Sequence, residues 1–273
     1  MDYAQEGSEH NTVTSLGVLP VTYLFGGVHR RDACSRTPTA LELICLEGTR
    51  CVKPTSQAYT WLQNAEHGVA DTLRARWSGE LDMEITPKQW RYACIMIHKC
   101  SISTTMQETA YKIMTHWYNT PAKMHGWNPQ IADSCWRCGS EKGTLVHIWW
   151  QCSYIARYWG KVIRLIRQIT DTGLTLNAAA CLLHVTNCSL KRYKNSLVRH
   201  LLNAAKSLIP LYWKSQRVPS VAEWLRRVSD VHAMEETLAQ ASERVEKRHK
   251  IWQPWVAFRY SSAYAIGVSQ TPT

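Results

Sequence analysis

The sequence is poor in Phe and has no long apolar run. Only two of its 273 residues are Phe, whereas thirteen are Trp and twelve are Tyr, so most of its aromatic side chains carry a polar group that suits half-exposed surfaces as well as cores. No run of eighteen apolar residues occurs, so we expect no transmembrane helix and no membrane partner. The first ten residues, "MDYAQEGSEH", have no basic or apolar segment of the kind that begins a signal peptide. We therefore expect an intracellular protein, in the nucleus, the cytoplasm or both.

Carboxylates are absent from one long stretch, between residues 172 and 222. The wider segment 134–222 contains thirteen Lys or Arg and only two acids, Glu141 and Asp171, and this difference of eleven equals the formal net charge of the whole chain, +11. A basic excess confined to one region is typical of a protein that binds a polyanion such as RNA or DNA. The alternative is a solvated basic surface that has no partner.

The sequence also shows no obvious catalytic constellation. It contains no Asp-Asp pair, and no glycine-rich phosphate loop or nucleophile–base arrangement stands out. We therefore expect that the chain is not an enzyme.

Helical periodicity predominates after residue 55 and predicts a mainly α fold, with a small zinc-binding hairpin or turn and a long C-terminal helix. Residues 1–55 show no sustained period and predict a poorly ordered segment. The remaining segments, in chain order, are predicted to be a helical part (56–133), a zinc-binding part (134–152), a basic helical part with the long helix (153–260) and a flexible tail (261–273).

Two helices are predicted to carry the basic surface. Over 153–169, apolar residues recur at helical spacing, while the opposite face carries Arg157, Lys161 and Arg164. A second basic helix is predicted in "LKRYKNSLVRHLLNAAKSLI", which contributes Lys191, Arg192 and Lys194.

The strongest helical pattern covers residues 220–252. Ser220 and Glu223 form a predicted capping box at its start. Apolar residues then follow at spacings of three and four, which suits either a long packing helix or the seam of a coiled coil. The second possibility predicts a homo-oligomer that forms through this helix.

Three Cys and one His lie within "CWRCGSEKGTLVHIWWQC", as Cys135, Cys138, His147 and Cys152. Thiolate and imidazole are the usual ligands of tetrahedral zinc. The two-residue gap suits a tight turn, and "GSEKG" predicts a hairpin loop that returns the chain toward His147. Four protein ligands describe a closed, structural site for one Zn²⁺. Two alternatives are buried reduced cysteines beside a core histidine, and a redox Cys-x2-Cys pair.

Several residues of this stretch are further candidates for contact with nucleic acid. Arg137 and Lys142 are placed to reach phosphates, and Trp149 or Trp150 could stack on a base. The equally plausible alternative is that both tryptophans pack against the helix that follows.

The order of these motifs resembles a known family. "HWYNTPAKMHGWNPQIADSCWRCGSEKGTLVHIWWQC", a Trp-bearing helix, "LVRHLLNAAKSLIPLYWKS" and "VPSVAEWLRRV" follow one another as in the C-terminal region of the second open-reading-frame protein of LINE-type non-LTR retrotransposons. The resemblance covers residues 56–258, and residues 1–55 match nothing in it. That region follows the reverse transcriptase, and Cys135, Cys138, His147 and Cys152 stand at its zinc-ligand positions.

The resemblance implies a truncated, RNA-binding part of a retrotransposon protein. The polymerase and endonuclease of such proteins are not implied, because the chain is too short for either domain and lacks the polymerase's paired aspartates. Two other hypotheses remain open from the sequence. One is a helical protein-interaction scaffold with a purely structural zinc ion, and the other is a transposon remnant without a function.

Overall fold

The computed structural model describes residues 55–57, 60, 67–99, 101–185, 190–241 and 245–269. Contacts divide the chain into two units, Met1–Ala70 and Asp71–Thr273. The predicted poorly ordered segment 1–55 lies, except for residue 55, outside the described residues. From His67 onward the helices are α4 (His67–Glu80), α5 (Pro87–Lys99), α6 (Thr104–Met114), α7 (Pro121–Trp127), η2 (His147–Gln151), α8 (Ser153–Thr170), α9 (Ala178–Leu183), α10 (Arg192–Leu208), η3 (Ile209–Tyr212), α11 (Val221–Ala241), α12 (Val245–Arg259) and α13 (Ser262–Ser269).

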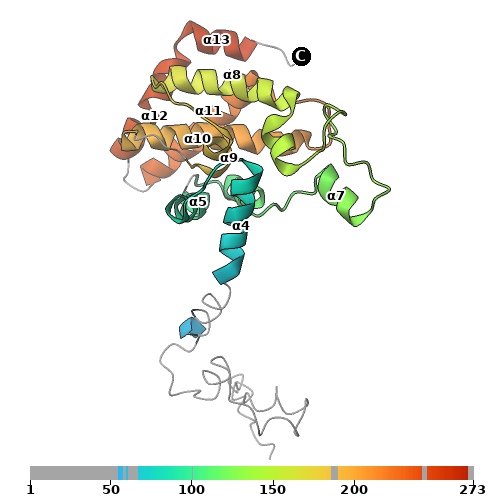
Figure 1. Ribbon diagram of the computed structural model, residues 1–273. Helices are drawn as coiled ribbons and strands as arrows, with labels where there is room; N and C mark the ends of the chain where they lie inside the picture. Colours follow the sequence, from blue (N-terminus) through green and yellow to red (C-terminus); the bar gives the residue numbers. More distant parts are fainter. Residues whose placement is uncertain are drawn as a thin grey trace, which may run out of the picture. The chain divides into compact units, whose positions relative to one another are not determined.

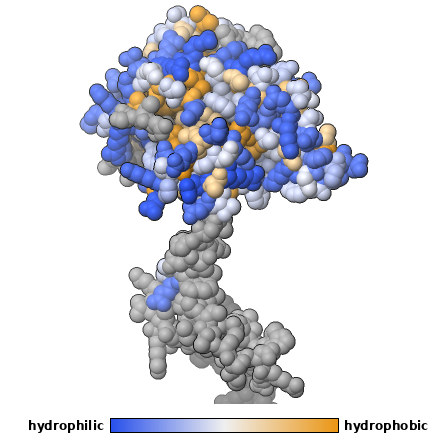
Figure 2. All heavy atoms as spheres, in the orientation of Figure 1, coloured by the Kyte–Doolittle hydropathy of each residue, from blue (hydrophilic) through white to orange (hydrophobic). Residues whose placement is uncertain are grey.

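The predicted mainly α fold is confirmed. Helices α8, α10, α11 and α12 pack on one another and form the centre of the second unit (Figure 1). Within the described residues no strand forms, and the β pairing seen there is an isolated antiparallel bridge between Ser134 and Lys142. Hydrophilic side chains cover much of the face shown in Figure 2, with apolar side chains visible between them. No helix in the described part of the chain is long and apolar enough to span a bilayer.

Buried tryptophans and tyrosines tie the central helices together through their polar groups. Trp224 Nε1 donates to the Leu201 carbonyl at 3.0 Å, and Tyr158 Oη donates to the Ala205 carbonyl at 3.1 Å. These bonds join α11 and α8 to α10. A chain rich in Trp and Tyr thus gains directional contacts that Phe could not provide.

Local sequence signals set several helix starts. Thr86 and Gln89 exchange side-chain-to-backbone bonds before α5, and Pro87 occupies its first position. The capping box predicted before α11 is present, because Ser220 N donates to Glu223 Oε2 at 2.8 Å and Glu223 N donates to Ser220 Oγ at 3.2 Å.

The long C-terminal helix exists as α11, but its predicted extension to residue 252 is wrong. Helix α11 ends at Ala241 and α12 begins at Val245. Trp252 Nε1 donates to Glu235 Oε2 at 3.1 Å, whereas seventeen residues of continuous helix would separate the two residues by about 25 Å. The chain therefore reverses, and α12 packs back against α11.

This reversal changes the expectation of a homo-oligomer formed through residues 220–252. The first part of the proposed seam, at Val221, Trp224, Val228 and Val231, is buried inside the chain. Met234 and Leu238 remain exposed, at 37% and 48%. Val245, at the start of α12, is 51% exposed as well. Self-association through residues 220–252 stays a prediction.

Part of the predicted flexible tail is helical. Residues 262–269 of the predicted flexible tail form α13, which packs on α11, and residues 270–273 lie outside the described part. Buried residues from the parts predicted as 56–133, 134–152 and 153–260 share one hydrophobic core. The candidate metal ligands belong to that core rather than to a separate module.

Candidate metal centre and basic surface

The four predicted ligands converge on one point. One ligand atom from each of Cys135, Cys138, His147 and Cys152 lies within 4.8 Å of every other, so the group could hold a metal ion. Cys135, His147 and Cys152 are at most 2% exposed, and Cys138 is half-buried. The sequence spacing alone identified all four residues.

A short hairpin supplies Cys135 and Cys138. Cys135 N donates to the Glu141 carbonyl at 2.7 Å, and Gly143 N donates to the Asp133 carbonyl at 2.7 Å, around the Ser134–Lys142 bridge. Gly139 has a φ of +69°, the left-handed conformation that glycine adopts at little cost. The predicted return loop is therefore present.

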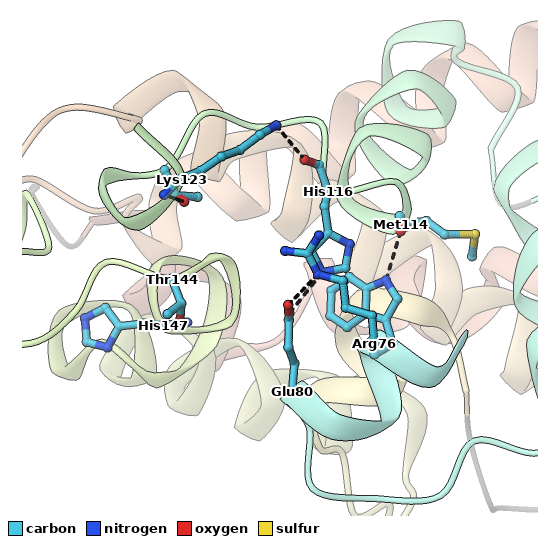
Figure 3. Close-up of polar contacts among 9 residues, drawn as sticks. Arg76, Glu80, Met114, His116, Lys123, Thr144 and His147 are labelled. Atoms are coloured by element: carbon cyan, nitrogen blue, oxygen red, sulfur yellow. Dashed lines mark hydrogen bonds and ion pairs between the residues drawn. The ribbon is translucent and has the colours of Figure 1, made fainter. Parts of the chain in front are cut away.

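A π-helical turn supplies His147 and Cys152. Cys152 N donates to the His147 carbonyl at 2.8 Å, an i to i+5 bond that adds one residue to the turn. This turn brings residues separated by four others onto the same side, which a regular α-helix would not do. The Thr144 hydroxyl, which lies near His147 in Figure 3, accepts from His147 N at 3.1 Å and fixes the start of the turn.

Glu141 orients the imidazole. His147 Nδ1 lies 3.1 Å from Glu141 Oε2, while Nε2 lies 3.4 Å from Cys138 Sγ. A proton on Nδ1 leaves the lone pair of Nε2 directed at the sulfur cluster, which is how carboxylates commonly orient metal-binding histidines. Sequence reasoning missed this role, although Glu141 is one of only two acids in segment 134–222.

The two hairpin thiols have different acidities. Burial raises the pKa of Cys138, but hydrogen bonds to its thiolate, first from the backbone of Ser140 and Glu141, outweigh burial and lower that pKa to about 6. Burial raises the pKa of the Cys135 thiol to about 11. The thiolate form is thus more favoured at Cys138 than at Cys135.

Arg137 does not face solvent, so its predicted contact with nucleic acid is wrong. The side chain is buried, at 3% exposure, and its guanidinium donates to the carbonyls of Ile148 at 2.8 Å and Tyr212 at 3.5 Å. Burial lowers the pKa of this guanidinium. Arg137 therefore joins the hairpin to η2 and η3.

Aromatic rings complete the support of the hairpin. Trp213 lies beside Tyr118, Trp136 and Trp149, with centroid separations of 4.7, 6.0 and 5.8 Å. Trp149 is fully buried, and Trp150 packs on Trp159 of α8 at 5.7 Å. Trp149 is therefore a core residue, and Trp150 packs against the following helix while it remains half-buried. The part played by Trp213 could not be seen in the sequence, because it lies more than 60 residues away.

Helix α8 begins directly at the fourth ligand, and its basic face is open. Cys152 precedes Ser153, the first residue of α8. Arg157, Lys161 and Arg164 are exposed, and α8 contains no acidic residue. Its apolar stripe is buried, as predicted; the buried residues include Ile155, Tyr158, Trp159, Val162, Ile166 and Ile169.

The second basic group lies at the far end of the same helix. Lys194 Nζ donates at 3.2 Å to the carbonyl of Asp171, the C-cap residue that follows α8. Lys191 and Arg192 are exposed, and Lys194 is half-buried. Lys142, on the hairpin, is exposed and lies 4.0 Å from Asp133. Lys214 and Arg217, which follow η3, are exposed as well, and sequence reasoning did not select them.

No protein-family model matches this chain. The site must therefore be interpreted from its own geometry.

Proposed function

We propose that this protein is a zinc-stabilised module that binds RNA or DNA through phosphate contacts and carries out no catalysis. The observation that supports the proposal best is that the candidate metal site and the basic helix α8 adjoin in the chain. A cluster of four metal ligands ends at Cys152, and the acid-free helix that starts there exposes Arg157, Lys161 and Arg164.

Zinc is the ion that suits this donor set. In a tetrahedral site with zinc–sulfur bonds of about 2.3 Å, neighbouring sulfurs are about 3.8 Å apart, and the Cys135 and Cys152 sulfurs are 3.9 Å apart. Three sulfurs and one imidazole nitrogen favour zinc over hard ions such as Mg²⁺ or Ca²⁺. Four protein ligands leave no position for a reactive water, so the ion's role is structural.

The residues that would contact phosphates are the exposed ones. These are Lys142, Arg157, Lys161, Arg164, Lys191 and Arg192. Lysine and arginine that neutralise phosphates release counterions, so affinity is expected to fall steeply with salt and to depend little on sequence.

The proposed origin follows from the resemblance described above. We infer that the chain derives from the region after the reverse transcriptase of a LINE-type retrotransposon protein, without its polymerase and endonuclease. The convergence of the four family-like ligand positions supports this origin.

RNA binding is tested by titration at several salt concentrations. Replacement of Arg157 and Arg164 together by Ala should weaken binding and reduce the slope of log K against log salt by roughly 2. The matched control replaces Lys88 and Arg91, two exposed bases on α5, by Ala. It should change neither the affinity nor the slope. A wild-type affinity that does not respond to salt contradicts the proposal.

Metal analysis tests the zinc centre. Purified protein should contain about one zinc per chain, and Cys138→Ser should lose it. Cys94→Ser, which alters a half-buried thiol outside the cluster, should retain zinc. A folded wild-type protein without zinc rules out the proposed centre.

A further inference from the structure

Two tryptophans stand apart from the others. Trp117 is 63% exposed and Trp127 is 65% exposed, and of the tryptophans that the structure describes only these two are exposed. Exposing an indole forgoes the favourable burial of a large apolar surface. Because the chain buries or half-buries its other described tryptophans, this pair needs an explanation of its own.

Lys123 connects the two tryptophans. Its ammonium donates to the His116 carbonyl at 3.2 Å (Figure 3) and to the Trp117 carbonyl at 3.5 Å. The same ammonium lies 5.3 Å from the centre of the Trp127 ring. Lys123 thus holds one positive charge at the backbone of Trp117, on the segment that joins α6 to α7, and over the ring of Trp127, on α7.

This group is anchored to the metal hairpin. Thr120 caps α7 by accepting from Lys123 N, and Pro121 occupies the first helical position. Ala122 N donates to the Gly143 carbonyl at 3.2 Å. A Cβ on Gly143 would lie 2.6 Å from Pro121 Cγ, so the hairpin and α7 meet at a contact that only glycine permits.

The charge around the pair favours an anionic partner. Residues 109–132 contain no Asp or Glu, but they contain Lys112 and Lys123. Lys112 forms an ion pair with Glu108 at 2.7 Å, and Glu80 lies 2.9 Å from His116. The positive charge beside the pair therefore comes from Lys123. An indole can stack on a nucleobase while a neighbouring ammonium group pairs with the phosphate of the same strand. Stacking on aromatic side chains requires bases whose faces are exposed, which single strands offer and duplexes do not.

We propose that Trp117 and Trp127, together with Lys123, which contacts the backbone of the first and the ring of the second, form a stacking platform that binds unpaired bases of single-stranded nucleic acid. The platform rests on the proposed function and adds a preference to it. The basic surface of α8 holds phosphates of any strand, whereas the platform favours strands that are not paired.

The test compares a single-stranded RNA with a duplex of the same length, by fluorescence anisotropy at fixed salt. Trp117→Ala and Trp127→Ala should each weaken single-strand binding roughly tenfold and leave duplex binding and the salt slope unchanged. Both side chains are exposed, so the variants should fold as the wild type does. Trp127→Tyr keeps an aromatic face and should recover most of the affinity, and Tyr260→Ala, which removes another exposed aromatic ring, should have no effect.

The outcomes separate this inference from the proposed function. If both tryptophan variants bind the single strand as the wild type does, while the Arg157 and Arg164 double variant loses affinity, the platform is refuted and the basic surface stands. If the wild type binds neither strand form, both proposals fail. If the wild type self-associates and the tryptophan variants do not, the pair is a protein contact and the platform is refuted.

Discussion

Gly139 adopts a positive φ of +69° directly after the second cysteine of the hairpin. A Cβ placed there would meet no atom within 4 Å, so Gly139→Ala tests backbone conformation without a clash. The left-handed conformation costs a non-glycine residue about 1 kcal/mol, which should lower the melting temperature by about 2–4 °C. Thermal unfolding followed by circular dichroism measures the change.

Gly160 provides a comparison in which replacement by Ala should stabilise the protein rather than destabilise it. It lies in the middle of α8, is exposed, and has equally open space around it. Because Gly disfavours a helix interior by about 1 kcal/mol relative to Ala, Gly160→Ala should raise the melting temperature. Shifts of the same sign in both variants contradict the conformational explanation.

At the scale of residues, chemistry that depends on local spacing could be predicted. The four ligands were found because Cys-x2-Cys and the later His and Cys lie within eighteen residues. Arg137 was misjudged because the carbonyl groups it meets include that of Tyr212, which is distant in sequence. A basic residue that is buried by a remote element looks the same in the sequence as one that faces solvent.

At the scale of elements, the packing of α12 on α10 and α11 depends on a buried carboxylate. Glu235 is fully buried; it accepts from Arg248 and Trp252, and its Oε1 lies 3.4 Å from His200 Nδ1. His200 stacks on Trp252 at 5.2 Å. Periodicity could not predict this reversal, because residues 220–252 keep an almost continuous helical pattern and the partner of Trp252 is set by the fold.

The same cluster makes stability depend on pH. Burial lowers the pKa of His200 to about 4, opposed by Glu235 and reinforced by Arg248 and Arg199. In the unfolded chain His200 is protonated below about pH 6.5, whereas in the folded protein it stays neutral until about pH 4. The free energy of unfolding therefore falls as the pH drops from 6.5 toward 4. Between pH 7.5 and pH 5, His200 should account for a loss of roughly 2 kcal/mol.

Urea unfolding of wild type and His200→Phe at both pH values measures this contribution. Phe keeps the ring stacked on Trp252 but cannot titrate, so the loss at pH 5 should become smaller. It should not vanish, because burial also lowers the pKa of His184 and of His232. His98→Gln, at an exposed site, should keep the wild-type loss, and an equal loss in His200→Phe refutes the assignment.

At the scale of the whole molecule, the metal centre and the helical core form one structure. Cys135 and Cys152 belong to the same hydrophobic core as Trp149, Trp159 and Trp224. Apparent binding free energies of structural zinc are about 10–16 kcal/mol, comparable with the whole stability of a typical domain, about 5–15 kcal/mol. With zinc as the proposed ion, its removal is therefore expected to cost a large share of the free energy of unfolding.

Chelation should lower the melting temperature by more than about 10 °C, because the free energy of metal binding contributes to folding only while the metal is bound. Near-ultraviolet circular dichroism should weaken, since the rings of Trp149 and Trp213 pack around the hairpin. Far-ultraviolet signal should persist in part, because α10, α11 and α12 contact one another independently of the ligands. Added zinc should restore the wild type but not Cys138→Ser. An unchanged melting temperature after complete removal of the metal would show that the core holds the four side chains together without an ion.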